Sequence, residues 1–155
     1  MNDVDETLSV RRGEGPRISP QVTAEVMEQI ALLSYGQGFS EGLRPAQWAA
    51  LRYFDRSETP ARTVGRFAQH NMVTPGSASQ TIQTLVKRGM LVRIPGDHDR
   101  RSHRVDLTER GKAAISSDPI ERLVDAIKSL DGGDGVKLAD LMASILQKMY
   151  RSPLK

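Results

Sequence analysis

The stretch from Thr74 to Arg88 carries side chains suited to contact nucleic acid. Thr74 suits a helix N-cap, Pro75 the first helical position and Gly89 the left-handed residue that ends a helix, so the stretch is predicted to be helical. One face of this helix combines amides, hydroxyls and cations without an acid: Gly76, Ser77, Ser79, Gln80, Thr81, Gln83, Thr84, Lys87 and Arg88. Such groups can bind base edges and the phosphates beside them.

The opposite face of the same helix is a narrow apolar stripe of Ala78, Ile82, Leu85 and Val86. The helix should therefore pack by this stripe and leave its polar face outward. An ordinary polar surface helix is the alternative interpretation, although its solvated face would usually mix Glu with Lys. The residues that follow the helix bear on this choice.

A short hairpin is predicted directly after the helix. Residues 90–94 are apolar enough for a strand, and 103–107 alternate with Val105 and Leu107 on one side. The turn between them is rich in Gly and Asp and contains Arg100 and Arg101. A basic tip of this kind can enter a narrow minor groove, where the negative potential is concentrated. Helix and hairpin together predict a winged helix.

These residues resemble the MarR family of bacterial transcription regulators over roughly residues 20 to 150. The resemblance rests on three groups of residues: Thr74-Pro75, Ala78-Ser79, Ile82, Leu85 and Gly89 in the helix; Asp99-Arg100-Arg101-Ser102 in the hairpin; and Leu107-Thr108-Glu109 with Gly111 after it. It implies a sequence-specific DNA-binding regulator, a repressor that a small-molecule effector releases. It also implies a homodimer bound to an inverted repeat in double-stranded DNA.

Each polar residue of the predicted interface is expected to have one of three roles. Gln80, Gln83 and Thr84 should meet base edges. Phosphates should be bound by Ser77, Ser79, Thr81, Lys87, Arg88 and Arg100. The resemblance further implies that Arg101 enters the minor groove and that Asp99 orients it, as in the family's Asp-x-Arg pattern.

Two helices should precede the polar helix and position it. Pro45 is expected to open one that runs through Phe54, and Thr59-Pro60 to cap another with Val64, Phe67 and Ala68 inward. The turn 71–73 then leads into the polar helix with helix-turn-helix spacing. The winged helix-turn-helix should occupy residues 44–107. The family often has a capping hydroxyl where this chain has Arg44, which weakens that cap.

Trp48, the only tryptophan, has two interpretations. Large aromatic side chains mostly pack in cores. Alternatively, Trp48 forms the wall of an effector pocket between the DNA-binding and dimer regions, where the resemblance implies a site for small, often aromatic, anions.

The flanking segments are predicted to form dimerisation helices, over residues 19–36 and 108–151. Apolar residues recur there at helical spacing and exceed what one small winged helix can cover. Pro119 interrupts what the family often makes one long helix. Residues 1–18 should form a flexible tail. The predicted fold is therefore mainly α with a small β-wing, a single MarR-like domain over residues 19–155.

Composition limits the other classes of function. The chain has 155 residues, 38% of them hydrophobic, and no cysteine, which excludes disulfides and a thiol nucleophile. Nine Lys and Arg against four Asp and Glu give residues 60–111 a net charge of +5, whereas the whole chain has +3. No apolar run reaches membrane-spanning length and the N-terminus is acidic, so a cytoplasmic protein is expected. No cofactor or metal site is predicted.

An enzyme is not expected. The sequence lacks phosphate-binding glycine loops, paired-histidine zinc helices and nucleophile elbows. Asp97 and Asp99, with His98 and His103, lie around an exposed turn without the low-dielectric setting of acid-base catalysis. A winged helix that binds only proteins remains the alternative, but it leaves the +5 segment unexplained. Salt-dependent DNA binding would separate the two.

Overall fold

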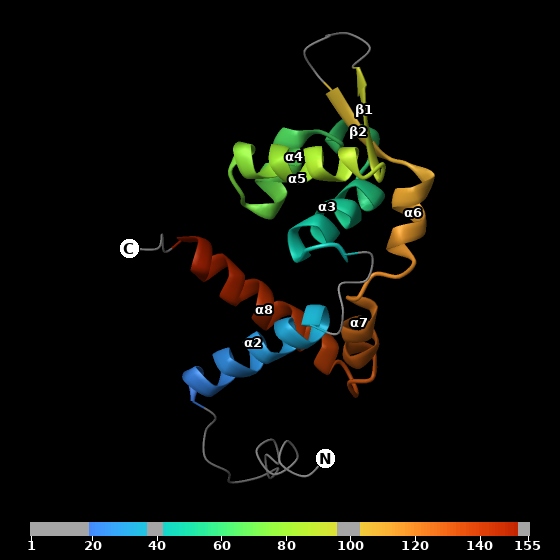
Figure 1. Cartoon of the computed structure of the whole chain (residues 1–155). Helices are drawn as coiled ribbons and strands as arrows, with labels where there is room; N and C mark the ends of the chain where they lie inside the picture. Colours follow the sequence, from blue (N-terminus) through green and yellow to red (C-terminus); the bar gives the residue numbers. More distant parts are fainter. Residues whose placement is uncertain (1–18, 37–41, 96–102, 152–155) are drawn as a thin grey trace. The chain divides into compact units, whose positions relative to one another are not determined.

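The computed structural model describes residues 19–36, 42–95 and 103–151 (Figure 1). Its elements are, in order, α2 Pro20–Gly36, α3 Pro45–Arg56, the 3-10 helix η2 Thr59–Ala61, α4 Val64–Asn71, α5 Pro75–Lys87, β1 Leu91–Pro95, β2 His103–Leu107, α6 Glu109–Ile115, α7 Glu121–Lys128 and α8 Asp134–Arg151. The predicted fold class, helical with a two-stranded wing, is confirmed. Contacts divide the chain into Met1–Leu33 and Ser34–Lys155.

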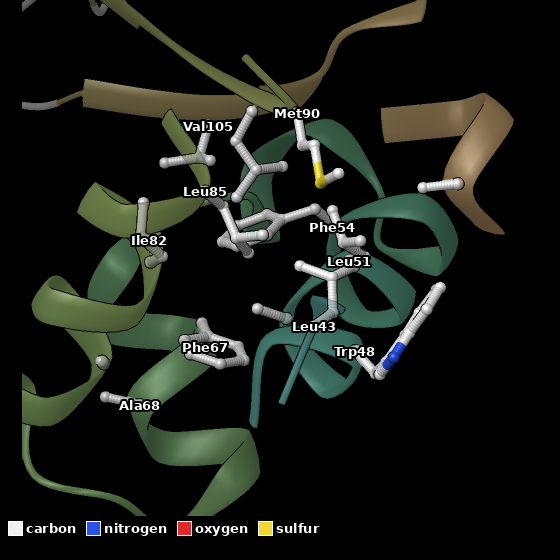
Figure 2. Packing of buried hydrophobic residues seen from close by; sticks show 14 residues of the cluster. Leu43, Trp48, Leu51, Phe54, Phe67, Ala68, Ile82, Leu85, Met90 and Val105 are labelled. Carbon is white, nitrogen blue, oxygen red and sulfur yellow. The ribbon is translucent and has the colours of Figure 1, made fainter. Parts of the chain in front are cut away.

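The hydrophobic core lies where α3, α4 and α5 meet the hairpin. Figure 2 shows Phe54, Leu85 and Met90 directed toward one another between α3, α5 and the wing, and each is fully buried. Burial of side chains this large contributes about 1.5–3 kcal/mol each. Because α5 contributes Leu85 and two further core residues, the packing fixes its rotation about its own axis.

The ends of α5 are those that the sequence predicts. Thr74 Oγ1 accepts a hydrogen bond from the backbone N–H of Ser77 at 3.1 Å. Gly89 follows the last turn with φ +70°, a conformation that glycine adopts without the Cβ penalty. The inward residues Ala78, Ile82 and Leu85 are all fully buried, as expected.

The wing is an antiparallel hairpin in which Leu91 pairs with Leu107 and Pro95 with His103. Val105 is fully buried, which gives the hairpin one core-facing side. The backbone N–H of Val105 also donates to Arg62 O at 2.8 Å, so the segment before α4 extends the hydrogen bonding of β2. This bond attaches the wing to the helix-turn-helix.

The helix before the turn begins later than predicted. Thr59-Pro60 opens only the short helix η2, and α4 begins at Val64. The physical reason is Arg62, whose carbonyl is bound by the wing and whose φ and ψ of −77° and 56° are not helical. Thr63 is the true N-cap and accepts from the N–H of Arg66 at 3.2 Å. Phe67 and Ala68 are buried as predicted, and Val64 packs partly buried against the core.

The predicted interruption at Pro119 separates α6 from α7. The new helix begins at Glu121, slightly after Asp118-Pro119, and Asp118 Oδ1 accepts from the N–H of Ile120 at 3.0 Å. Asp118 is also the partner of Arg52 on α3, whose Nη1 lies 2.8 Å from both carboxylate oxygens. The break is therefore fastened to the helix-turn-helix by an ion pair.

Burial by itself lowers the pKa of Arg52, but hydrogen bonds to Asp118 and to the hydroxyl of Tyr35 outweigh it. The pKa of Arg52 is therefore raised above its ordinary value, and its guanidinium stays charged.

The turn between α7 and α8 is short, because α8 already begins at Asp134. Gly132 and Gly133 have positive φ and make the turn. Neither α2 nor α8 contains a buried residue. Of the helices described, none has both the length and the apolar character needed to cross a membrane.

Candidate nucleic-acid interface

The exposed face of α5 is the candidate interface. Residues Gly76, Ser77, Gln80, Gln83 and Lys87 are exposed, whereas Ser79, Thr81, Thr84 and Arg88 are half-buried on its flanks. Because the apolar residues on the opposite side of α5 are buried in the core, the polar residues face outward. The structure thus brings together all nine residues that the sequence assigned to this helix face. Their contacts with DNA stay predictions.

The threonines of this face already use their hydroxyl protons. Thr84 Oγ1 donates to Gln80 O at 2.9 Å and Thr81 Oγ1 donates to Ser77 O at 3.0 Å. Each hydroxyl oxygen can then accept from a base or a phosphate-bound water but can no longer donate. The amides of Gln80 and Gln83 are the groups at the centre of the face that can both donate and accept, which suits bidentate binding of adenine.

Arg88 has a contact that the sequence did not indicate. Its Nη1 donates to the carbonyl oxygen of Gly42 at 2.9 Å, which ties the C-terminal end of α5 to the segment before α3. Gly42 has φ +61°, so its carbonyl direction depends on a conformation that glycine favours. Phosphate binding by Arg88, expected from the sequence, therefore has to coexist with a structural contact.

The turn between α4 and α5 sets the angle at which the interface helix leaves the domain. Met72 closes α4 in the left-handed conformation, with φ 50°, and its N–H donates toward Ala68 O and Gln69 O. Asn71 Nδ2 donates to Phe67 O at 3.2 Å. A left-handed methionine costs about 1 kcal/mol, which the surrounding bonds offset. The turn between α4 and α5 therefore has a defined backbone conformation.

A charged cluster at the base of the wing was missed by sequence reasoning. Asp106 lies between two arginines: Arg62 Nη1 is 3.1 Å from its Oδ1, and Arg104 Nη2 is 2.8 Å from its Oδ2. Arg104 and Asp106 share one side of β2, which the sequence does indicate. Arg62 lies far away in the chain, and no local pattern links it to Asp106. The cluster keeps a net charge of +1 beside the hairpin.

Asp99, Arg100 and Arg101 lie outside the described residues, and their roles stay predictions. Trp48 is 1% exposed and belongs to the hydrophobic cluster, at the edge of the group that Figure 2 shows. This placement fits its interpretation as a core residue. Its role as the wall of an effector pocket stays a prediction.

The fold and the exposed polar face of α5 define a winged helix-turn-helix protein. Residues 41–102 match the sequence model of the MarR family. The part of the chain that this model covers is therefore a MarR-family winged helix. No curated protein sequence matches it significantly.

Solved structures of regulators share this fold. The PcaV regulator of Streptomyces coelicolor, in complex with its natural ligand, has a TM-score of 0.67 and 15% identity over 87% of this chain and 98% of its own. The repressor CouR, bound to a 23-mer DNA duplex, has a TM-score of 0.64 and 22% identity, over 86% of this chain and 99% of its own. The regulator MOSR of M. tuberculosis, in complex with DNA, has a TM-score of 0.64 and 21% identity, over 86% of this chain and 97% of its own. At these identities the likeness establishes the fold.

Proposed function

We propose that this protein is a sequence-specific DNA-binding transcription regulator that acts as a homodimeric repressor and is released by a small-molecule effector. The observation that carries the proposal is the outward face of α5. Its inner side is locked in the core by three fully buried residues, and its outer side offers amides, hydroxyls and a lysine without an acid. A rigid helix with this face fits the major groove.

Different residues of the interface should contact base edges and phosphates. Gln80 and Gln83, exposed near the middle of α5, should contact bases. Lys87, exposed in the last turn, should contact a phosphate beside the groove. The wing arginines Arg100 and Arg101 should bind the neighbouring minor groove, with Asp99 orienting Arg101. A two-fold dimer would present two such helices to an inverted repeat.

The repressor and effector parts of the proposal draw support from the structural relatives. CouR is described as a transcriptional repressor bound to DNA, and PcaV as a regulator in complex with its natural ligand. A winged helix that contacts only proteins is the competing function. It offers no reason for an acid-free face on α5 or for the net charge of +5 over residues 60–111.

Selection of binding sites from random DNA, with the wild type and two variants, tests the proposal. Gln83→Ala should relax base preference at one position in each half-site, a loss of about 1–3 kcal/mol in discrimination, and keep most nonspecific affinity. Lys87→Ala should weaken all sequences about equally and reduce the slope of log affinity against log salt by about one unit per lost contact.

Three results would count against the proposal in different ways. Absence of any salt-dependent DNA binding would favour the protein-binding alternative. Binding without a selected consensus would remove sequence specificity. A changed consensus with Lys87→Ala, together with an unchanged one for Gln83→Ala, would mean that the assignment of base-reading and phosphate-binding residues on α5 is wrong.

A further inference from the structure

The charged cluster of Arg62, Asp106 and Arg104 joins the wing to the segment that precedes α4. Each oxygen of the Asp106 carboxylate has its own arginine. Oδ1 lies 3.1 Å from Arg62 Nη1, whereas Oδ2 accepts from Arg104 Nε at 3.0 Å and lies 2.8 Å from Arg104 Nη2. Across the hairpin, Asp106 stands opposite Val92, an apolar residue. The carboxylate therefore does not serve to hold the two strands together; it connects β2 to Arg62.

Arg62 contacts β2 through its backbone and its side chain at once. Its carbonyl oxygen accepts from the N–H of Val105 at 2.8 Å, and its Nη1 donates to Asp106, the next residue of the strand. Its Nε donates to Ser57 O at 2.8 Å, directly after the end of α3. Contacts to two consecutive residues fix the direction of β2 as well as its position, since one hydrogen bond alone would let the strand turn about it.

The segment that carries Arg62 is itself held between two helices. The hydroxyl of Tyr53 on α3 donates to Ala61 O at 2.8 Å, and Thr63 caps the first turn of α4. The same helices support the interface helix, since α5 packs against α3, α4 and β1 (Figure 1). The wing and α5 therefore share one support, and the contacts of Arg62 help to set the angle between them.

Neither stability nor charge gives a strong reason for an acid at position 106. The side chains of Arg62, Asp106 and Arg104 are 28%, 18% and 37% exposed, and ion pairs with access to water contribute little to stability. An acid in the wing also opposes phosphate binding, because it lowers the positive charge of residues 60–111. An acid here is unfavourable for DNA binding unless the orientation that it gives the wing outweighs this effect.

We infer that Asp106 and Arg62 are positioning residues for DNA binding, which hold the wing at the angle to α5 that lets both contact one duplex. The inference rests on the proposed function. Without the carboxylate, β2 would keep its pairing with β1 and the buried side chain of Val105, but it would lose a contact that fixes its direction. A wing that is oriented before binding loses less conformational freedom when the DNA is bound.

The test uses the inverted-repeat duplex that the wild-type protein selects from random DNA. Asp106→Asn should weaken binding of this duplex by about fivefold to tenfold, whereas the loss of a negative charge alone would strengthen it. Arg62→Lys keeps the charge but lacks the planar fork that reaches Ser57 and Asp106 together, and it should give a similar loss. Glu109→Gln is the matched control. It removes one negative charge from the same region, at a side chain that is 90% exposed, and should not weaken binding.

Arg101→Ala, made in each of these proteins, reports how much affinity the wing contributes. In the wild type and in Glu109→Gln it should weaken binding by about tenfold, for loss of a charge-assisted contact. In Asp106→Asn and Arg62→Lys it should weaken binding by about threefold or less, because a loosely held wing gains less from the contact. A variant that is merely less stable would have a smaller folded fraction, but the cost of Arg101→Ala in it would be unchanged.

The inference is overturned if Asp106→Asn binds the duplex as tightly as the wild type or more tightly. It is also overturned if Arg101→Ala has the same cost in Asp106→Asn and Arg62→Lys as in the wild type. Circular dichroism should give equal helix content for all variants, and Arg62→Lys alone decides the outcome if Asp106→Asn does not fold. A wild type without salt-dependent DNA binding defeats the proposed function and the inference with it, whereas DNA binding with a constant cost of Arg101→Ala defeats the inference alone.

Discussion

Gly111 shows how one residue constrains the join between α6 and the wing. A Cβ atom at this position would lie 2.1 Å from the carbonyl oxygen of Met90, the residue that follows α5 and Gly89. The N–H of Thr108 donates to that same carbonyl at 3.1 Å, and Thr108 Oγ1 donates to Gly89 O at 2.6 Å. The first turn of α6 therefore sits directly on the backbone that leaves the interface helix.

Gly111→Ala should destabilise the protein, because the added methyl group cannot fit without moving α6 or Met90. We expect a loss of about 2 kcal/mol or more in the free energy of unfolding, measured by urea denaturation. Gly65→Ala is a matched control on α4, where an added Cβ meets nothing within 4 Å. That change should be neutral or stabilising by up to about 1 kcal/mol. Equal stability of the two variants would contradict the steric argument.

Residues that act locally could be predicted from the sequence, and those with distant partners could not. Thr74, Pro75 and Gly89 are recognisable because each meets a local backbone requirement of α5. The contact of Arg88 with Gly42 depends on packing between segments that are far apart in the chain. The end of α3 and the end of α4 likewise lie around one hollow, lined by Arg56 and His70. No spacing in the sequence indicates that these two residues are neighbours.

At the scale of whole elements, the same distinction explains where helices begin. The apolar periodicity identified α3, α4 and α5, and Pro119 correctly placed a break before α7. The start of α4 was predicted too early because Thr59-Pro60 has the form of a cap. What excludes Arg62 from the helix is a hydrogen bond to Val105 of the wing, a tertiary contact. Tertiary pairing here overrides a local capping signal.

The break between α6 and α7 gives a prediction at this scale. Asp118, with 3% of its side chain exposed, pairs with Arg52, whose side chain is 14% exposed. Asp118→Ala would leave a largely buried guanidinium without its carboxylate and would also remove the acceptor for the N–H of Ile120. We expect a loss of about 3 kcal/mol in unfolding free energy, at the lower end for buried pairs because Arg52 keeps some contact with water.

Asp125→Ala is the matched control for this ion pair. Asp125 pairs with Lys128 at 3.3 Å, but both side chains are mostly exposed, at 73% and 68%. Exposed pairs contribute little, so the cost should be about 0.5 kcal/mol or less. If thermal or urea denaturation gives similar losses for the two alanine variants, the junction between α3 and the helix break is not held by the Asp118 ion pair.

At the scale of the whole molecule, the terminal helices α2 and α8 carry large apolar side chains that the described residues leave exposed. On α8, Val136, Leu141 and Met149 are each more than 60% exposed. Leu32 and Leu33 on α2 are more than half exposed. Soluble monomers rarely keep contiguous apolar surfaces of this kind in water. The sequence predicted these stripes, but their periodicity alone cannot say whether the same chain or a second copy covers them.

We expect a homodimer held by the residues of α2, α7 and α8, because covering each large side chain would contribute about 1.5–3 kcal/mol. Sedimentation at micromolar concentration should give the mass of two chains. Leu141→Glu would place a charge in the stripe of α8 and should shift the protein toward monomer, whereas Val92→Glu, the same change at an exposed residue of the wing, should leave the dimer intact. A wild-type monomer, or equal dissociation of both variants, would contradict this assembly and with it the requirement for two half-sites in the DNA.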